Sequence, residues 1–272
     1  EKPMKPTYRV NRTRAALKKG ETVRVAEINR AFDPVVIEVI AETGFTCVWL
    51  DMEHSHLDLA GLSTMVLAAR AVDLDVVVRI PHGPYNQIVK TLEVGAGGVI
   101  WPHCKSAAEA RELVRMAKFR PLGLRGIGGG RDSHYGKLPV TEYLDAANDN
   151  TLLGVMIEDE EGVEDVEAIA GVEGIDLLFV GPGDLSHSYG VEREPGSPVT
   201  QERVLQAYDR VAKACRANGK VMGTAVGPGE PMRQVVQRGA RWLNCCHEVT
   251  ALRSGYEQAF RATGEIVSGG KS

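Results

Sequence analysis

The stretch LLGVMIEDEEGVEDVEAIAGVEGIDLLFVGPGD, residues 152–184, contains two apolar runs separated by a helix-like segment. The first run covers residues 152–158 and the second covers residues 176–181, and each is apolar on both faces. Such runs are typical of parallel strands in a sheet that helices cover on both sides. The stretch therefore predicts a strand–helix–strand unit of an α/β protein, and each strand leads to an acid, Glu158 and Asp184.

The same alternation of β-branched runs and helical patterns continues along the whole chain. Eight such units in about 250 residues fit a (β/α)8 TIM barrel better than an open, doubly wound sheet. The open sheet would need the pattern G-x-G-x-x-G directly after its first strand, and AEINRAFDP (26–34) has no glycine there. The predicted strands are 22–28, 47–52, 75–80, 98–102, 152–158, 176–181, 220–225 and 241–246.

Two predicted helices have recognisable ends. The segment 106–119 begins at Ser106 as N-cap, with Glu109 at the capping-box position. The segment 200–219 begins at Thr200 and ends at Gly219. We expect one domain over residues 1–272, with peripheral tails at about 1–12 and 265–272.

The composition indicates a soluble globular protein. Of the 272 residues, 43% are apolar and 25% are charged, and the net charge of -4 argues against nucleic acid or an anionic membrane as the main partner. No apolar run approaches the roughly 20 residues that span a bilayer, and EKPMKPTYRV lacks the apolar core of a signal peptide. The five cysteines show no CxxC spacing, so we expect reduced thiols in a cytoplasmic protein.

Polar residues gather at the carboxyl ends of four predicted strands. In a TIM barrel these ends form the active face, so we expect the side chains to converge on one mouth. They are Asp51, Glu53 and His54 after the second strand, Arg79 in the third, Glu158 in the fifth and Asp184 after the sixth.

Glu158 and Asp184 are the candidate metal ligands. They are one strand–helix unit apart, so their strands should be neighbours and their carboxylates can meet. Two bare carboxylates that close repel each other, and a divalent cation removes the repulsion. All-oxygen ligation favours Mg²⁺ or Mn²⁺, with water and substrate in the other positions. The alternative is that both acids cap helices or pair with surface lysines.

Arg79 ends a strand that should be buried on both faces, and a guanidinium there must find an anion or an electron-rich oxygen. The alternative is an ion pair with Asp51 or Glu53 on the adjacent strand, and the two interpretations are compatible. His54 is placed for acid–base work, with Asp51 positioned to hold one imidazole nitrogen, or it is a packed histidine. His56 and His103 have weaker cases, as a loop or helix-cap residue and as a wall residue.

Two glycine-rich segments complete the candidate site. In GPGD (181–184) the backbone N–H groups of the tight turn can cup a carboxylate or phosphate oxygen, so Gly181, Pro182 and Gly183 are the candidate substrate-binding residues. Residues 123–136 form a long glycine-rich loop that we expect to act as a mobile lid and to select the substrate, with Arg131, Asp132 and His134 reaching it.

Taken together, LDMEH (50–54), VVVRIP (76–81), VMIED…G (155–162), GVEGIDLLFVGPGDLS (171–186) and RGIGGG (125–130) resemble the HpcH/HpaI aldolases, over about residues 13–255. The resemblance implies a (β/α)8 barrel, a hexamer in which the last helix is exchanged between partners, and a class II aldolase. Such an enzyme cleaves or forms 4-hydroxy-2-oxo acids from pyruvate, or a close 2-oxo acid, and an aldehyde.

Carried over to this chain, the resemblance implies roles for the strand-end residues. Glu158 and Asp184 hold Mg²⁺ or Mn²⁺, with Co²⁺ as an alternative, and Arg79 contacts the keto oxygen. Asp51, Glu53 and His54 form the acid–base cluster, and the backbone of Gly181, Pro182 and Gly183 cradles the carboxylate. Three features depart from the family pattern: VAEIN (25–29) brings Glu27 and Asn29 to the mouth, Asp159 replaces a threonine, and the segment around RGIGGG is more glycine-rich and polar.

The expected chemistry is proton abstraction beside a ketone, with the metal and Arg79 stabilising the enolate. No predicted strand end carries a lysine, which argues against a Schiff base. Two alternatives remain open: a lyase for a CoA thioester of the malyl-CoA or citryl-CoA type, and a non-catalytic barrel that binds a metal or an oxo acid. The first needs a basic site for a nucleotide tail, and no clear basic patch is visible.

Overall fold

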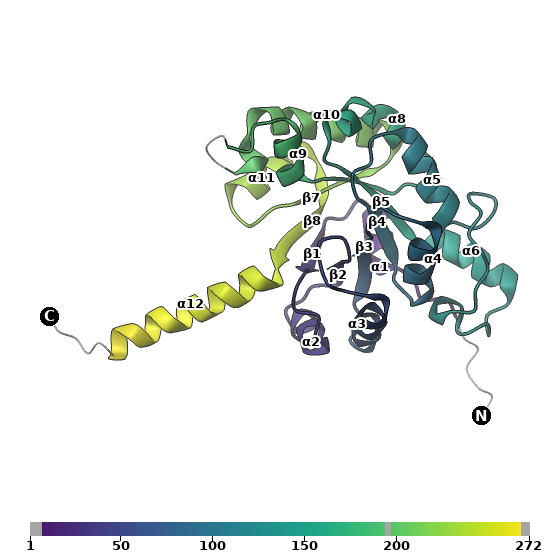
Figure 1. Ribbon diagram of the computed structural model, residues 1–272, viewed down its shortest axis with the longest axis horizontal. Coiled ribbons are helices and arrows are strands. Elements are labelled where there is room, and N and C mark those ends of the chain that lie inside the picture. Colours follow the sequence, from purple (N-terminus) through teal and green to yellow (C-terminus); the bar gives the residue numbers. More distant parts are fainter. Residues whose placement is uncertain (1–6, 194–196, 268–272) are drawn as a thin grey trace.

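The computed structural model describes residues 7–193 and 197–267. Eight parallel strands close into a barrel in the order β1 to β8, with β1 paired to β8 (Figure 1). The strands are β1 Val23–Ile28, β2 Cys47–Asp51, β3 Asp75–Arg79, β4 Gly98–Trp101, β5 Leu152–Ile157, β6 Leu177–Val180, β7 Val221–Ala225 and β8 Ala240–His247. The TIM-barrel prediction is confirmed, and each strand lies within two residues of its predicted ends.

Helices surround the barrel, most of them between consecutive strands. They are α1 Arg12–Lys18, α2 Pro34–Glu42, α3 Leu59–Ala71, α4 Tyr85–Glu93, α5 Ala107–Ala117, α6 Val140–Asn150, α7 Glu160–Glu164, α8 Val166–Ala170, α9 Pro182–Ser188, α10 Glu202–Asn218, α11 Glu230–Arg238 and α12 Glu248–Val267. Two short 3-10 helices, Arg131–Ser133 and Pro198–Thr200, lie in the loops. None of the helices within the described ranges is long and apolar enough to cross a bilayer.

Two of the predicted helix-end residues, Ser106 and Gly219, are confirmed, and Thr200 is not. Ser106 is the N-cap of α5 and accepts a hydrogen bond from the Glu109 N–H, and Gly219 ends α10 in the left-handed conformation. The start of α10 differs from the prediction, because Thr200 closes the preceding 3-10 helix and Gln201 takes the N-cap position. The Gln201 side chain is occupied elsewhere, since its amide oxygen accepts a hydrogen bond from Ser186.

The strands bury side chains on both faces, as the doubly apolar runs predict. Successive residues of a strand point to opposite faces, so each strand fills two apolar layers. One layer lies inside the barrel and includes Val25, Trp49, Val77, Phe179 and Trp242. The other lies between the strands and the helices, and includes Val48, Leu50, Val78, Val155 and Leu178.

Helix α1 packs at the amino-terminal end of the barrel. Its Leu17 belongs to the apolar layer inside the barrel. The backbone N–H and the hydroxyl of Thr13 both donate to Asp75, the first residue of β3, at 2.7 and 2.8 Å. Asn11, within the tail that the sequence predicts to be peripheral, is buried and donates to the Gly97 carbonyl. Residues 1–6 and 268–272 of the two predicted tails lie outside the described residues.

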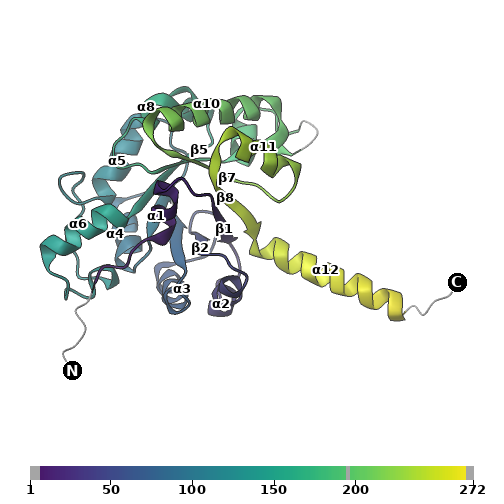
Figure 2. The ribbon, with the colours of Figure 1, turned by 180° about the vertical axis from the view of Figure 1, so that it is seen from behind.

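Helix α12 extends away from the barrel after β8 (Figures 1 and 2). Its large apolar side chains Leu252, Tyr256 and Phe260 are exposed, at 49%, 75% and 81% of their accessible surface. They are spaced four residues apart, so they share one face of the helix. This apolar face is uncovered within the described part of the chain.

Candidate active site

The carboxyl ends of the strands carry a polar layer that follows directly from strand periodicity. Val23 and Val25 point into the barrel, so the next inward residue of β1 is Glu27. The same count from Cys47 and Trp49 leads to Asp51, from Val77 to Arg79, and from Met156 to Glu158. The two-residue period therefore places one arginine and three acids in a single layer above the apolar interior.

A cavity of about 180 Å³ opens into this layer, and we call it the mouth cavity. It brings Arg79 together with Glu158 and Asp184, the two acids predicted to hold a metal. Asp51, Glu53 and His54 lie outside its lining. The mouth cavity is lined by Glu27, Trp49, Arg79, Met156, Glu158, Phe179, Gly181, Pro182, Gly183, Asp184, Ala225 and Asn244.

Arg79 is fixed by two carboxylates. Its Nε and Nη2 donate to the two oxygens of Asp51 at 2.9 and 2.7 Å, and Nη1 lies 3.2 Å from a carboxylate oxygen of Glu53. Burial would raise the pKa of Asp51, but the hydrogen bonds and charge of Arg79 outweigh it and lower that pKa. Burial would lower the pKa of Arg79, but the hydrogen bonds and charge of Asp51 outweigh it, and the pKa of Arg79 is raised. The predicted ion pair with the adjacent strand is confirmed for both acids.

Glu158 has one satisfied and one free oxygen. Its Oε1 accepts a hydrogen bond from the His103 N–H at 2.8 Å, whereas its Oε2 is buried with no partner among the described residues. Burial raises the pKa of Glu158 to about 7, with the charges of Asp184 and Glu53 adding to the effect and the His103 contact opposing it. A buried oxygen without a donor is an open position for a cation.

Gly181 makes room for this carboxylate. A Cβ at residue 181 would lie 2.4 Å from Glu158 Oε2, so only glycine lets β6 pass so close to the acid. The Gly181 N–H donates to the Ile157 carbonyl, and Pro182 has no N–H. Of the predicted carboxylate cradle, only the Gly183 N–H is therefore left for a ligand.

The donor set fits a divalent cation of the oxygen-preferring kind. Glu158 supplies a buried free oxygen, and Asp184, in the first turn of α9, lines the same cavity. Within the described ranges, no group of three or more His, Cys, Asp or Glu side chains is placed to hold a metal. A cation at this position would therefore take two carboxylates from the protein and its other ligands from water or substrate, as Mg²⁺ commonly does.

His54 lies at the edge of the site. Its side chain is 58% exposed, and its Nε2 lies 3.6 Å from a Glu53 oxygen. The expectation that Asp51 holds its imidazole is wrong, because both Asp51 oxygens are taken by Arg79 and the Asp51 contact to His54 is made by the backbone N–H. His56 packs its ring against Phe32 in the loop, and the N-cap of α3 is Asp58.

His103 is more central than the sequence indicates. Its Nδ1 lies 2.9 Å from an Asp159 oxygen, and its Nε2 lies 3.9 Å from a Glu53 oxygen. Partial burial lowers the pKa of His103, but the charge of Glu158 and the contact with Asp159 outweigh it, and the pKa is raised. His103 comes just after the end of β4, and this could have identified it, because the other site residues also lie at or just after the ends of their strands.

Two asparagines around Glu27 complete the β1–β8 side of the mouth. Asn29 and Asn244 each donate to one oxygen of Glu27, both at 3.0 Å. The sequence places Glu27 and Asn29 near the mouth, whereas Asn244 was not foreseen. Its signal is the inward period of β8, two residues after Trp242.

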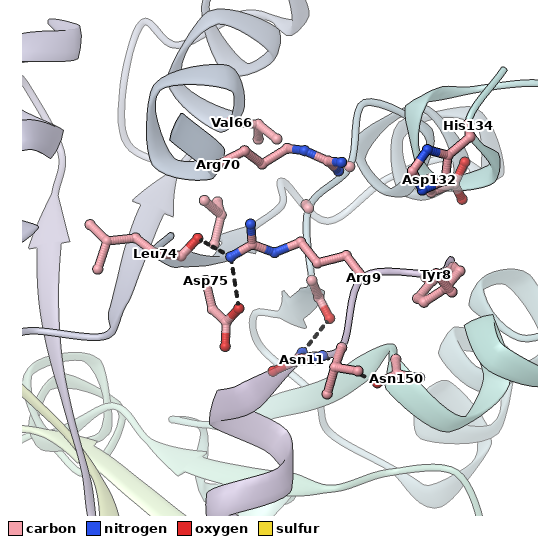
Figure 3. A pocket seen from close by; sticks show the side chains of 15 residues that line it. Tyr8, Arg9, Asn11, Val66, Arg70, Leu74, Asp75, Asp132, His134 and Asn150 are labelled. Carbon is pink, nitrogen blue, oxygen red and sulfur yellow. Dashed lines mark hydrogen bonds and ion pairs between the residues drawn. The ribbon is translucent and has the colours of Figure 1, made fainter. Parts of the chain in front are cut away.

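The glycine-rich loop 123–136 does not lie over the mouth, so the prediction that it acts as a lid there is wrong. The loop connects α5 to α6 and is anchored by a buried ion pair between Arg125 and Asp132 at 2.7 Å. Asp132 and His134 line a pocket beside Asp75, at the amino-terminal end of the strands (Figure 3). Arg131 binds the carbonyls of Ser63 and Val94. The loops after helices lie at the end of a TIM barrel opposite to its active face.

Comparisons with known proteins identify the family of the chain. The family model described as HpcH/HpaI aldolase/citrate lyase matches residues 29–254. A hydroxypyruvate/pyruvate aldolase of Pseudomonas aeruginosa is 36% identical over 77% of this chain and 78% of its own. A 4-hydroxy-4-methyl-2-oxoglutarate aldolase of Chaetomium globosum is 35% identical over 76% of each chain.

A solved structure extends the similarity to the fold. The HpcH/HpaI aldolase of Desulfitobacterium hafniense superposes with a TM-score of 0.85 at 29% identity, covering 92% of this chain and 96% of that one. The resemblance predicted from the strand-end motifs is thereby confirmed. The chain belongs to the HpcH/HpaI aldolase/citrate lyase family and is an aldolase-type lyase.

Proposed function

We propose that the protein is a divalent-metal-dependent aldolase that cleaves or forms 4-hydroxy-2-oxo acids, with pyruvate or a close 2-oxo acid as one partner and an aldehyde as the other. One observation carries the proposal: Arg79, held by Asp51 and Glu53, lines the same cavity as Asp184 and the Glu158 carboxylate with its free oxygen. The names of the relatives support a 2-oxo acid substrate.

The metal would be held by Glu158 and Asp184, and Mg²⁺ or Mn²⁺ suits these ligands, with Co²⁺ as an alternative. When bound, it would supply a Lewis acid for the 2-oxo acid. Arg79 directs its guanidinium to the keto oxygen, where negative charge develops as the neighbouring C–H is broken. The Gly183 N–H, beside Gly181 and Pro182, binds the substrate carboxylate.

His54 is the proposed base, with Glu53 beside it. Glu53 lies between His54 and Arg79, 3.6 Å from the first and 3.2 Å from the second, so one carboxylate orients both groups. His54 takes the proton from the substrate carbon in the addition direction and from the 4-hydroxyl in cleavage. Asp51 acts through Arg79, which it fixes in place with both carboxylate oxygens.

The lining of the cavities disfavours a CoA-thioester lyase. A nucleotide tail needs cationic partners, and Arg79 is the only Lys or Arg among the described residues that line the mouth cavity or the groove beside it. Arg79 is itself neutralised by Asp51 and Glu53. A small aldehyde makes no such demand.

Proton exchange on pyruvate tests the proposal directly. In D₂O with Mg²⁺ or Mn²⁺, we expect the methyl proton signal of pyruvate to decay in the presence of the protein and to persist after EDTA treatment. A panel of 4-hydroxy-2-oxo acids should then release pyruvate. A barrel that binds metal or oxo acid without catalysis would leave the methyl signal unchanged, and that result would reject the proposal.

We further propose that the chain forms one domain in a cytoplasmic homo-oligomer, a hexamer, in which α12 packs on a partner barrel. The uncovered face with Leu252, Tyr256 and Phe260 supports this proposal, because an isolated apolar helix face needs a partner surface. Light scattering should show a large assembly for the wild type and a smaller one for Tyr256→Glu with Phe260→Glu. The control Gln258→Glu, on the opposite face of α12, should assemble like the wild type.

A further inference from the structure

Glu27 lies between two cavities. It lines the mouth cavity, and it also lines a larger groove of about 770 Å³ that we call the rim groove. Pro182, Ala225 and Asn244 are shared by both as well. A ligand that extends from the mouth cavity into the rim groove must therefore pass the Glu27 carboxylate.

Hydrogen bonds fix the direction of this carboxylate. Asn244 accepts a hydrogen bond from the Trp242 indole N–H at 2.8 Å, which orients its amide so that the NH₂ group donates to Glu27. Asn29 donates to the other oxygen. In register, Glu27 is opposite Trp49 of β2 and His247 of β8, so neighbouring strands hold it on both sides.

The charge of Glu27 has no direct counterion. Among the described residues, the ion pairs of Arg79 are with Asp51 and Glu53, and the Arg30 guanidinium binds the backbone carbonyls of Asn29 and His54. The rim groove has no Lys or Arg in its described lining, and its apolar wall includes Val199, Val226 and Pro231. An anion in the rim groove would thus face the Glu27 carboxylate with no Lys or Arg in the described lining of the groove to offset its charge.

We infer that Glu27 selects the acceptor aldehyde: its carboxylate accepts a hydrogen bond from a hydroxyl of a neutral hydroxyaldehyde and excludes aldehydes that carry a carboxylate. The inference rests on the proposed aldolase function and names the class of its second substrate. Glu27 has unused lone pairs, since each oxygen receives one hydrogen bond from an amide. A carboxylate brought beside it would meet like charge in a partly desolvated site.

The test compares two acceptors in the addition to pyruvate. Glyceraldehyde is neutral and hydroxylated, and succinic semialdehyde carries a carboxylate. We expect the wild type to prefer glyceraldehyde in kcat/KM. Glu27→Gln keeps the size of the side chain and removes its charge, so it should reduce this preference by about tenfold or more. The control Glu38→Gln, which removes a charge from the outer face of α2, should keep the wild-type preference.

Proton exchange on pyruvate distinguishes a failure of the role of Glu27 from a failure of the aldolase function. The ratio of kcat/KM for the two acceptors is compared at whatever exchange rate Glu27→Gln retains, because both additions begin with the same proton abstraction from pyruvate. An unchanged preference with exchange retained would overturn the role of Glu27 and leave the aldolase function standing. Loss of exchange in folded Glu27→Gln would also overturn it, because Glu27 would then act in enolisation. Absence of exchange in the wild type would instead reject the aldolase function.

A measurement on the wild type alone tests the role of Glu27 even when Glu27→Gln does not fold. Exclusion by charge weakens with salt, so raising NaCl from about 50 to about 500 mM should increase kcat/KM for succinic semialdehyde relative to glyceraldehyde. A preference that does not change with salt would contradict an electrostatic role for Glu27.

Discussion

Arg79 and Asp51 form a bidentate ion pair across neighbouring strands, with Nε–Oδ1 and Nη2–Oδ2 distances of 2.9 and 2.7 Å. The two residues are directly opposite in the β2–β3 register. Glu53 takes the third nitrogen of the guanidinium. The planar group is therefore held in one orientation at the wall of the mouth cavity, and a substrate oxygen meets a donor that does not need to reorganise.

Arg79→Lys should lower kcat for pyruvate proton exchange by about tenfold or more, a loss of about 1.4 kcal/mol in transition-state stabilisation. Lysine keeps the charge but cannot reproduce the planar fork that Asp51 and Glu53 hold. NMR exchange rates at saturating pyruvate measure the effect, with Arg111→Lys on the exposed face of α5 as control. Wild-type exchange in Arg79→Lys would count decisively against this role.

Glu158→Ala and Asp184→Ala should each abolish Mn²⁺ binding, because each removes one of the two carboxylates available to a cation in the mouth cavity. Titration calorimetry with Mn²⁺ measures this, and circular dichroism should show an intact barrel. Glu164→Ala, an exposed acid at the end of α7, is the matched control and should bind like the wild type. Unchanged Mn²⁺ affinity in both site variants would contradict the assignment of Glu158 and Asp184 as metal ligands.

Gly181→Ala should weaken Mn²⁺ binding by about tenfold or more without removing any charged group, since a coordinating carboxylate tolerates little displacement. The new Cβ would lie 2.4 Å from Glu158 Oε2 and push the carboxylate from its position. Gly183→Ala is the control, because a Cβ there meets nothing within 4 Å. Equal affinities in the two alanine variants would show that the Glu158 position does not matter for the metal.

His54→Ala should reduce kcat by roughly 10²- to 10⁴-fold, the usual effect of a positioned acid–base group, and leave Mn²⁺ binding intact. Exchange rates of the wild type and the variant at one fixed pH measure the effect. The comparison with His103→Ala locates the base, because both histidines lie beside Glu53. A wild-type exchange rate in His54→Ala would assign the proton transfer elsewhere.

Lys118 should make stability rise with pH between about 8 and 10.5. Burial lowers its pKa from 10.5 to about 8 in the folded protein, and the charge of Asp176 only partly opposes this. In that window the unfolded chain keeps a proton that the folded protein has released, so the penalty for the buried charge fades as pH rises. The full effect is on the order of 3 kcal/mol.

Urea unfolding at pH 7.5, 9 and 10.5 checks this through the difference between wild type and Lys118→Met. The variant leaves the Asn148 and Thr151 carbonyls without their donor at every pH, so only the pH-dependent part of the difference reports the titration. The free energy of unfolding should rise with pH more steeply in the wild type than in the variant. Lys90→Met, an exposed site on α4, should run parallel to the wild type.

The sequence by itself determined the barrel and part of the layer of side chains at its mouth. Doubly apolar runs can only be parallel strands covered by helices, and the two-residue period fixes which side chains face inward. Arg79 and Glu158 could therefore be placed at the mouth from the strand boundaries alone. The two-residue period also places Glu27 and Asn244 at the mouth, although no sequence motif singles out Asn244.

The tertiary structure decided which of these side chains contact one another. Asp51 is three residues from His54 in the chain but directly opposite Arg79 across the sheet, and the cross-strand contact takes both of its oxygens. His103 joins Glu158 and Asp159 only because β4 and β5 are neighbours in the closed barrel. The spacing of these residues along the chain does not predict these contacts.

The loop 123–136 shows the same limit. Its glycines correctly indicated an irregular segment, but its place depends on the helices it connects, and α5 and α6 bring it to the flank and amino-terminal end of the barrel. The free oxygen of Glu158 also depends on the tertiary structure, since it results from the close approach of Gly181, directly after β6, and from the absence of a donor among the described residues nearby. Periodicity sets the direction of a side chain, and only barrel closure sets its partners.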